Sequence, residues 1–464
     1  MKLKVVSVKK ASISLAEGVR SVKNKQFSAV EWAEACLSRI DQCESELKAW
    51  AYFDRELALK TAGQIDQKLA SGDPAGVLCG APIGVKDIFN TQDMPTCMGS
   101  PIWKDFTPGN DARTVFYLKE ADAMILGKTA TAEFAVHALG ETLNPHDPSR
   151  TPGTSSTGSA VAVATGMIPA ALGTQTAGSI IRPASFCGVY GFKPSFGLIP
   201  RTGTLKTTDT LDTVGWFARS SEDLELLFDV LRVKGTNFPL SHQAFEDVSR
   251  QTVKGRPWRV ALVKTYTWKN AEPYAKQSLE NFAKQLSKDS NIHLEEVELE
   301  KAFQDSHRIH SVIYEKALTH YFKKEFEAHT LISSVFYEMI NRGKNLTLDD
   351  YKNALEEQIK LSQKMEKFFE NFDIILTLST AGEAPLRNVV EKDDSCLIWT
   401  LCGLPVIGAP QFKSPGGLPF GAQLVARRYN DPLLFNFTKF LKSKELIADA
   451  ETCFAGKKEG VYGN

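Results

Sequence analysis

Apolar residues recur at helical spacing in the first part of the chain. One apolar stripe begins at Ala29 and continues through Trp32 and Cys36 to Ile40, and a second follows from Leu57. An apolar face with this period is typical of an amphipathic helix that packs on a core. We therefore predict a helical N-terminal segment over residues 1–70, with its helices within 11–70.

The pattern changes at Leu78 to short apolar runs bounded by glycine and proline. Such runs are typical of strands buried on both faces, and helical stretches alternate with them here. The predicted strands cover residues 82–85, 123–127, 260–263, 374–376, 406–407 and 420–425. This alternation predicts an α/β fold in which helices cover both faces of a sheet.

Helical patterns also occupy much of the second half of the chain. We predict helices within 273–288 and 302–370. Ser220 and Thr347 are helix-start signals, because acidic residues follow each of them in the first turn. Residues 234–257 are polar and aperiodic and are interpreted as a linker. The block 302–370 is a candidate helical cap over the site, within one large domain that spans 1–464.

Composition narrows the classes of partner. The 464 residues contain 55 Lys and Arg against 55 Asp and Glu, so the formal net charge is zero. A balanced charge argues against binding to nucleic acid or to an anionic membrane surface. Residues 151–181 carry no charge and are long enough to cross a bilayer, but they are rich in Gly, Ser and Thr. Such a segment instead indicates backbone packed tightly around a buried site.

The cysteines and the N-terminal residues indicate the cellular compartment in which the protein is expected. The eight cysteines are scattered and include no C-x-x-C pair, which argues against a zinc site and a disulfide framework. Residues 1–10 contain only a short apolar stretch, whereas a signal peptide needs a longer one. We expect a cytoplasmic protein with reduced thiols and no metal.

Three segments contain residues that could carry chemistry. Residues 80–87 read Gly-Ala-Pro-Ile-Gly-Val-Lys-Asp and place Lys86 at the end of an apolar strand. Burial lowers the pKa of a lysine, and the neutral amine is a competent general base. The alternative is a structural lysine that snorkels toward the surface or pairs with Asp87. Residues 153–159 read Gly-Thr-Ser-Ser-Thr-Gly-Ser and precede a helical pattern, so this loop could also be a simple helix cap.

The third segment, residues 173–183, reads Gly-Thr-Gln-Thr-Ala-Gly-Ser-Ile-Ile-Arg-Pro. Small residues allow the backbone to approach a ligand closely, and successive free N–H groups form a site for a developing anion. A serine at the end of such a turn, here Ser179, has an oxyanion hole built from backbone groups.

Taken together, the three segments resemble the amidase signature family. The resemblance is close through residues 78–218 and extends to Gly-Leu-Pro at 403–405 and Gly-Gly-Leu-Pro-Phe-Gly at 416–421. In that family a lysine, a serine in the Gly/Ser loop and a nucleophilic serine 24 residues later form a triad, and Ser155 and Ser179 have this separation. The resemblance implies a mixed, twisted β-sheet surrounded by α-helices.

The resemblance also implies the roles of individual residues. Ser179 is the expected nucleophile, Ser155 relays its proton, and Lys86 is the final base. The expected oxyanion hole consists of the backbone N–H groups of Thr176, Ala177, Gly178 and Ser179. The peptide bond between Thr154 and Ser155 is expected to be cis. No cofactor is implied.

The chain departs from the family pattern at several positions. Thr154 and Thr157 replace two glycines of the usual Gly-Gly-Ser-Ser-Gly-Gly loop. Gln175 stands where Asp is usual, Ala177 replaces a glycine, and the arginine that follows the nucleophile is one residue later, at Arg182. These departures favour a stand-alone amidase over the alternative, a glutaminase-type subunit of a tRNA-dependent amidotransferase.

Two other motifs indicate different chemistry and are set aside. Residues 127–129 read Gly-Lys-Thr, but Asp122 stands where a phosphate-binding loop requires its first glycine. His307, His310 and His320 lie near Glu315, but no H-E-x-x-H pattern accompanies them.

The resemblance implies hydrolysis of a small amide, carbamate or urea-like substrate by a homodimer. It does not identify the substrate. Residues 201–212, 302–340 and 378–400 are the segments expected to form the pocket. Phe303, Tyr314, Tyr321 and Trp399 would suit an apolar substrate there, although each could equally belong to the core.

Overall fold

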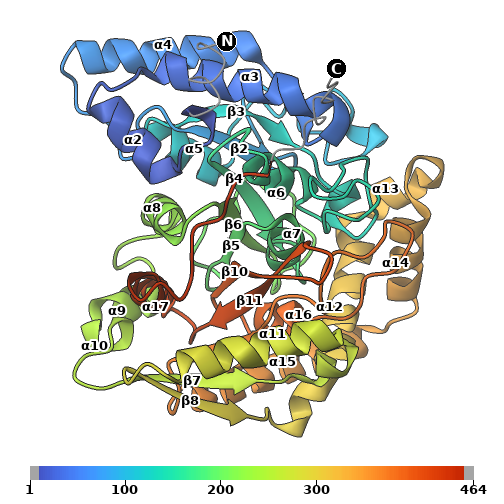
Figure 1. The fold of residues 1–464 in the computed structure, drawn as a ribbon. Coiled ribbons are helices and arrows are strands. Elements are labelled where there is room, and N and C mark those ends of the chain that lie inside the picture. Colours follow the sequence, from blue (N-terminus) through green and yellow to red (C-terminus); the bar gives the residue numbers. More distant parts are fainter. Residues whose placement is uncertain (1–9, 454–464) are drawn as a thin grey trace, which may run out of the picture.

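The computed structural model describes residues 10–453, and its centre is a mixed β-sheet (Figure 1). Within this part of the chain the sheet has eleven strands, in the order β1-β3-β2-β4-β6-β5-β10-β11-β9-β7-β8. The strands are β1 Trp50–Phe53, β2 Pro82–Lys86, β3 Met124–Thr129, β4 Ala170–Gln175, β5 Tyr190–Lys193, β6 Thr213–Ala218, β7 Trp258–Val263, β8 Ile292–Val297, β9 Ile374–Leu378, β10 Val406–Lys413 and β11 Pro419–Val425.

Parallel pairing is confined to two regions of this sheet. Strand β2 is parallel to both β3 and β4, and β7 is parallel to both β8 and β9. The remaining neighbours are antiparallel. The predicted α/β fold with a mixed sheet surrounded by helices is therefore confirmed.

Helices pack around the sheet, and β8 forms one of its open edges (Figure 1). They are α2 Leu15–Lys23, α3 Ala29–Leu47, α4 Arg55–Ala70, α5 Arg113–Glu120, α6 Thr157–Ala164, α7 Ile181–Cys187, α8 Ser221–Leu231, α9 Pro239–Glu246, α10 Val248–Gln251, α11 Pro273–Leu286, α12 Ser306–Tyr321, α13 Lys323–Glu327, α14 Ser334–Lys344, α15 Leu348–Phe368, α16 Cys396–Leu401 and α17 Asp431–Ser443. None of the helices in residues 10–453 has the length and apolar character that a membrane crossing requires.

The N-terminal helices follow the sequence pattern with one exception. Helices α2, α3 and α4 lie together at one end of the molecule, near β3 (Figure 1). Residues 50–53, however, form strand β1 rather than helix, and this strand pairs with residues 127–129 of β3. Its sequence, Trp-Ala-Tyr-Phe, is rich in aromatic residues, which favour strands over helices. Residues 1–9 of the predicted segment lie outside the described residues.

The two helix-start signals are confirmed, whereas the predicted linker is wrong in part. The Ser220 hydroxyl accepts from the Asp223 N–H at the start of α8, and Thr347 forms a capping box with Asp350 at the start of α15. Residues 234–257 contain α9 and α10, whose buried residues are Ser241, Ala244 and Gln251 instead of a long apolar stripe. A short helix with so narrow a buried face has little periodic signal.

The charge-free segment lies at the centre of the fold. Every residue from 151 to 181 is buried, and the segment forms a loop, α6, β4 and the turn that leads into α7. Close approach explains its small residues: a Cβ on Gly158 would lie 2.1 Å from the Ala49 carbonyl oxygen and 2.4 Å from the Ala130 nitrogen. The segment thus belongs to the core of the protein and brings the two serine-containing motifs next to β2.

Candidate active site

Lys86 is the last residue of β2 and its side chain is fully buried. Its Nζ donates to the Ser155 Oγ at 2.8 Å and to the Thr174 Oγ1 at 3.0 Å. Burial lowers the pKa of Lys86 from its ordinary value to about 7, and the negative charge of Asp212 opposes this shift. A substantial fraction of this amine is therefore neutral near pH 7.

Asp87 pairs with a different lysine. The Nζ of Lys128, on the neighbouring strand β3, lies 3.1 Å from a carboxylate oxygen of Asp87, and both side chains are buried. Lys128 also donates to the Pro95 carbonyl and the Thr96 hydroxyl. The alternative in which Asp87 neutralises Lys86 is therefore wrong, and the Gly-Lys-Thr segment at 127–129 supplies an internal ion pair.

The loop that contains Ser155 is tied to the neighbouring strands. The peptide bond between Thr154 and Ser155 is cis, as the resemblance implied. The Ser155 carbonyl accepts from the Ala132 N–H at 3.0 Å, and the Ser156 hydroxyl donates to the Thr174 carbonyl at 3.2 Å. These contacts hold the Ser155 hydroxyl over the end of β2, where it meets the lysine.

The turn before Ser179 is organised by Gln175. The Gln175 Oε1 accepts from the N–H groups of both Ile180 and Ile181 at 2.9 Å, and its Nε2 donates to the Thr400 hydroxyl at 2.9 Å. The Thr400 hydroxyl in turn donates to the Ala177 carbonyl at 2.7 Å. An amide side chain can accept and donate at once, so Gln175 connects the turn to α16 as well as closing it.

Two residues that the sequence did not mark as site residues hold Thr176. Its hydroxyl donates to the Asp212 Oδ1 at 2.9 Å, and its carbonyl accepts from the His310 Nε2 at 2.8 Å. Because a carbonyl only accepts, the proton of His310 is on Nε2. Burial lowers the pKa of His310 to about 3, so the ring is neutral. Asp212 also accepts from the Thr207 and Thr208 N–H groups. The sequence offered only a general signal for both: Asp212 lies in the segment 201–212 and His310 in the segment 302–340, which were expected to form the pocket.

Ser179 lies beyond this turn, 5% exposed. Within residues 10–453 its hydroxyl forms no hydrogen bond with Ser155 or Lys86, so the structure brings the lysine and Ser155 into direct contact but not the third residue. In the same part of the chain, the N–H groups of Ala177, Gly178 and Ser179 donate to no other group. They are free to donate to a bound anion.

A cavity of about 590 Å³ lies beside the turn and is bordered by Thr154 and Ala177. Helices α12 and α14 form part of its wall, so the block 302–370 contributes to it. Tyr314 is among the lining residues, whereas Phe303 and Trp399 are buried in the core. The apolar lining consists of Leu139, Ala177, Val335, Met339, Val389, Val390 and Leu397.

Charged side chains also line this cavity, in equal numbers of each sign. The basic residues are Arg182, Arg342, Arg387 and Lys392. The acidic residues are Glu315, Glu391, Asp393 and Asp394. The lining therefore has no net formal charge when its histidines are neutral.

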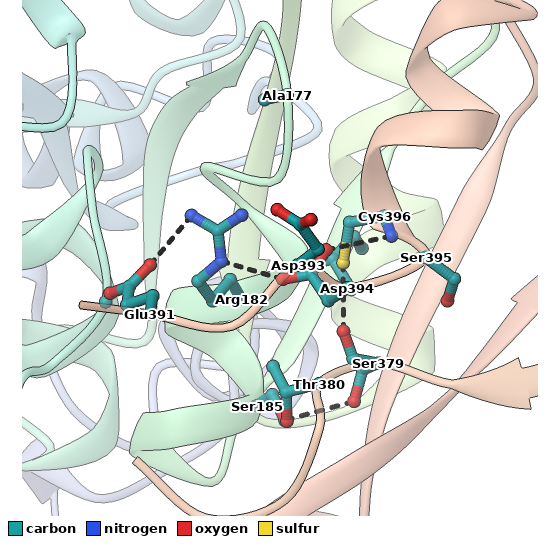
Figure 2. Close-up of polar contacts among 12 residues, drawn as sticks. Ala177, Arg182, Ser185, Ser379, Thr380, Glu391, Asp393, Asp394, Ser395 and Cys396 are labelled. Carbon is teal, nitrogen blue, oxygen red and sulfur yellow. Dashed lines mark hydrogen bonds and ion pairs between the residues drawn. The ribbon is translucent and has the colours of Figure 1, made fainter. Parts of the chain in front are cut away.

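Arg182 is the charged residue nearest to the turn in sequence, and Figure 2 shows its two carboxylate partners. Its Nη1 lies 2.9 Å from Glu391 and its Nε 2.8 Å from Asp394. A Cβ on Gly178 would lie 2.8 Å from the Arg182 Nη2, so the guanidinium packs directly against the residue that precedes Ser179. A side chain at position 178 would therefore displace the guanidinium from this position.

Two of the three histidines in the cavity wall are hydrogen-bonded within the protein. His310 bonds to the Thr176 carbonyl, and the His307 Nδ1 bonds to the Tyr266 hydroxyl. Among residues 10–453 no group of three or more His, Cys, Asp or Glu side chains is arranged to hold a metal ion. The eight cysteines, all within these residues, are free thiols.

Comparison with known proteins identifies the family. The sequence profile of the family described as Amidase matches residues 31–435. The chain belongs to the amidase family.

Its relatives include an amidotransferase subunit, the class of protein given above as the alternative to a stand-alone amidase. A glutamyl-tRNA(Gln) amidotransferase subunit from Carboxydothermus hydrogenoformans is 30% identical over 471 residues, which cover 91% of this chain and 95% of that protein.

Solved structures that share more than a quarter of their residues with this chain include the following two. A structure of a vestigial protein complex, described in connection with the origins of an s-triazine catabolic enzyme, has a TM-score of 0.84 at 26% identity and covers 95% of this chain and 100% of its own. A structure described simply as an amidase has a TM-score of 0.83 at 27% identity, with 93% and 100% covered.

Proposed function

We propose that this protein is a stand-alone amide hydrolase in which Ser179, Ser155 and Lys86 form the catalytic triad. The observation that carries the proposal is the buried lysine of β2, whose Nζ lies 2.8 Å from the Ser155 hydroxyl and whose pKa is lowered to about 7. A base with a pKa near neutrality is present in both forms at physiological pH, which suits proton transfer in both directions.

In the proposed mechanism the Ser179 Oγ attacks the amide carbonyl carbon. Its proton passes to the Ser155 oxygen as the Ser155 proton passes to the neutral Lys86 amine. The tetrahedral oxyanion accepts from the N–H groups of the turn 176–179, of which three have no other partner in the described chain. The relay then returns a proton to the leaving nitrogen, the C–N bond breaks, and an ester to Ser179 remains. Water cleaves the ester through the same relay.

The products are a carboxylic acid and ammonia or an amine. Carboxamides, carbamates and urea-like compounds contain the required C–N bond, and esters would form the same acyl-enzyme. A role for residues 302–370 as a cap, the single domain over 1–464 and a homodimeric state remain predictions.

The alternative function is a glutaminase-type subunit of a tRNA-dependent amidotransferase. The observation that favours it is the 30% identity with the Carboxydothermus hydrogenoformans protein along nearly the whole chain. The departures at Thr154, Thr157, Gln175 and Ala177 favour the stand-alone enzyme. The two functions differ in the need for a partner: a stand-alone amidase turns over substrate as the purified chain.

The test measures ammonia or amine release by the purified chain from aryl, short aliphatic, carbamate and urea-like substrates. We expect activity that Ser179→Ala lowers by a factor on the order of 10³ or more. Ser185→Ala is the matched control: it removes the same atom, but within residues 10–453 that hydroxyl is hydrogen-bonded only to Thr380 and Ser379. Equal activity of the Ser179→Ala variant and the wild type would refute the mechanism. Activity that appears only with a co-purified partner would support the amidotransferase function.

A further inference from the structure

Arg182 is positioned where an unpaired guanidinium would bind a negatively charged substrate. Its guanidinium packs against Gly178, the residue before the proposed nucleophile. A free guanidinium binds a carboxylate through two parallel N–H donors, so an unpaired arginine here would select amides that carry a carboxylate near the scissile bond.

In this structure Arg182 is paired with two carboxylates. Glu391 and Asp394 occupy its Nη1 and Nε, as Figure 2 shows. The two carboxylates differ in how firmly they are held. The Asp394 side chain is 4% exposed, and its other oxygen accepts from the Cys396 N–H at 3.0 Å at the start of α16. The Glu391 side chain is 21% exposed and lies next to Val390, which is 90% exposed.

The other cations of the cavity wall are occupied as well. Arg342 pairs with Glu315 at 2.7 Å, and Lys392 pairs with Glu272 at 2.5 Å. Arg387 donates to the carbonyls of residues 142 and 140 at 2.7 and 2.6 Å. Every basic side chain of the lining therefore has an acceptor within the protein.

We propose that the ion cluster of Arg182, Glu391 and Asp394 makes this pocket selective for uncharged amides, with Glu391 as the residue that determines the selectivity. The proposal rests on the proposed function, because it takes the turn at Ser179 as the site of reaction. A carboxylate that enters meets the carboxylates of Glu391 and Asp394, and each basic side chain of the lining already has an acceptor. Its loss of hydration is therefore not compensated. A neutral amide loses no charge solvation and contacts the apolar part of the wall.

This selectivity also bears on the alternative function. Glutamine carries a carboxylate and an ammonium group close to its amide, and such a substrate would have to displace Glu391 to reach Arg182. The cluster therefore favours a neutral substrate for this chain over a free amino acid.

Matched pairs of short amides test the proposal. Butanamide and succinamate have the same number of carbons, as do pentanamide and glutaramate, and in each pair only the second carries a carboxylate. We expect kcat/KM of the wild type to be at least about tenfold higher for the neutral member, the factor that 1.4 kcal/mol of lost interaction produces. Comparable kcat/KM values within each pair would overturn the proposal.

Glu391→Gln keeps the shape of the side chain and removes the charge that occupies Arg182. We expect it to raise kcat/KM for succinamate and glutaramate about tenfold, mainly through KM, and to change the neutral substrates less than about threefold. Glu391→Ser is a second variant that removes the contact altogether. Asp393→Asn is the matched control, because Asp393 is on the same segment, is 65% exposed and forms no ion pair with Arg182.

Equal gains in Glu391→Gln and Asp393→Asn would overturn the proposal, since a general change of charge would then explain them. Isothermal calorimetry with the Ser179→Ala variant measures the affinities for butanamide and succinamate, and therefore the preference for the neutral amide, without turnover. A protein that binds butanamide selectively but hydrolyses neither compound would contradict the proposed function alone, whereas one that binds succinamate equally well would contradict the inference alone.

Discussion

The amine nitrogen of Lys86 lies 2.8 Å from the hydroxyl oxygen of Ser155, although 69 residues separate them in the chain. The contact forms because β2 and β4 are parallel neighbours and the loop that contains Ser155 packs onto the end of both. Neither residue has a carboxylate partner in this contact. Burial lowers the pKa of Lys86 to about 7, so the neutral amine that catalysis needs is present near neutral pH.

Activity should rise with pH through the titration of this lysine. Below pH 7 the Lys86 amine is protonated and cannot accept the relayed proton, and above it the neutral base predominates, so kcat/KM should increase across pH 6–8 with a midpoint near 7. Lys86→Met and Lys86→Arg should each lower kcat/KM by about 10²–10⁴, because neither side chain can act as a base. Steady-state kinetics over this pH range measure both effects.

A second buried lysine provides the control for that experiment. Burial also lowers the pKa of Lys193 to about 7, but its Nζ donates to the carbonyls of Pro194 and Leu404 and does not contact the site. In the folded fraction of the Lys193→Met variant, the kcat/KM profile should keep its midpoint near pH 7. Loss of the midpoint in this variant, with retention in Lys86→Met, would contradict the assignment.

Asp212→Asn should move the activity profile toward lower pH. The negative charge of Asp212 raises the pKa of Lys86, so its removal lowers that pKa further and the neutral base appears at a lower pH. Asp209→Asn changes the charge of the same loop at an exposed carboxylate paired with Lys206, and it should leave the midpoint unchanged. Profiles of kcat/KM against pH for the two variants distinguish these outcomes, and an upward shift in Asp212→Asn would contradict the expectation.

Gln175 should affect catalysis because its side chain closes the turn before Ser179. Gln175→Ala removes the acceptor of the Ile180 and Ile181 N–H groups and the donor to Thr400, so kcat should fall by about 10²-fold as the oxyanion donors lose their alignment. Gln175→Asp keeps an acceptor for the two N–H groups and should retain more activity. If alanine and aspartate variants had equal kcat, the bond to Thr400 rather than the closed turn would be the important contact.

The buried pair of Asp87 and Lys128 should contribute to stability. Asp87→Ala leaves the Lys128 ammonium buried without its carboxylate and should lower the free energy of unfolding by about 3–5 kcal/mol, measured by denaturant titration. Replacing both residues, as in Asp87→Ala with Lys128→Met, should recover much of this loss. The exposed pair of Arg55 and Asp41 is the control, and Asp41→Ala should cost no more than about 1 kcal/mol.

The sequence determined much of the site because its signals are local. The charge-free residues 151–181 indicated a buried, tightly packed segment, and all of them are buried. The helix starts at Ser220 and Thr347 were readable because a cap depends on residues three positions apart. The motifs around Lys86, Ser155 and Ser179 were recognisable from short strings, and the family to which they point is confirmed.

Only the tertiary structure decided which charges meet. Asp87 pairs with Lys128 of the adjacent strand instead of with Lys86, and Arg182 pairs with Asp394, 212 residues away. Periodicity and turn chemistry report on a few neighbouring residues, whereas the partner of a buried charge depends on the order of strands and on the segments packed against their ends. That is why the sequence showed a lysine and an arginine near the serines, whereas the fold decided that burial lowers the pKa of the lysine and that two carboxylates pair with the arginine.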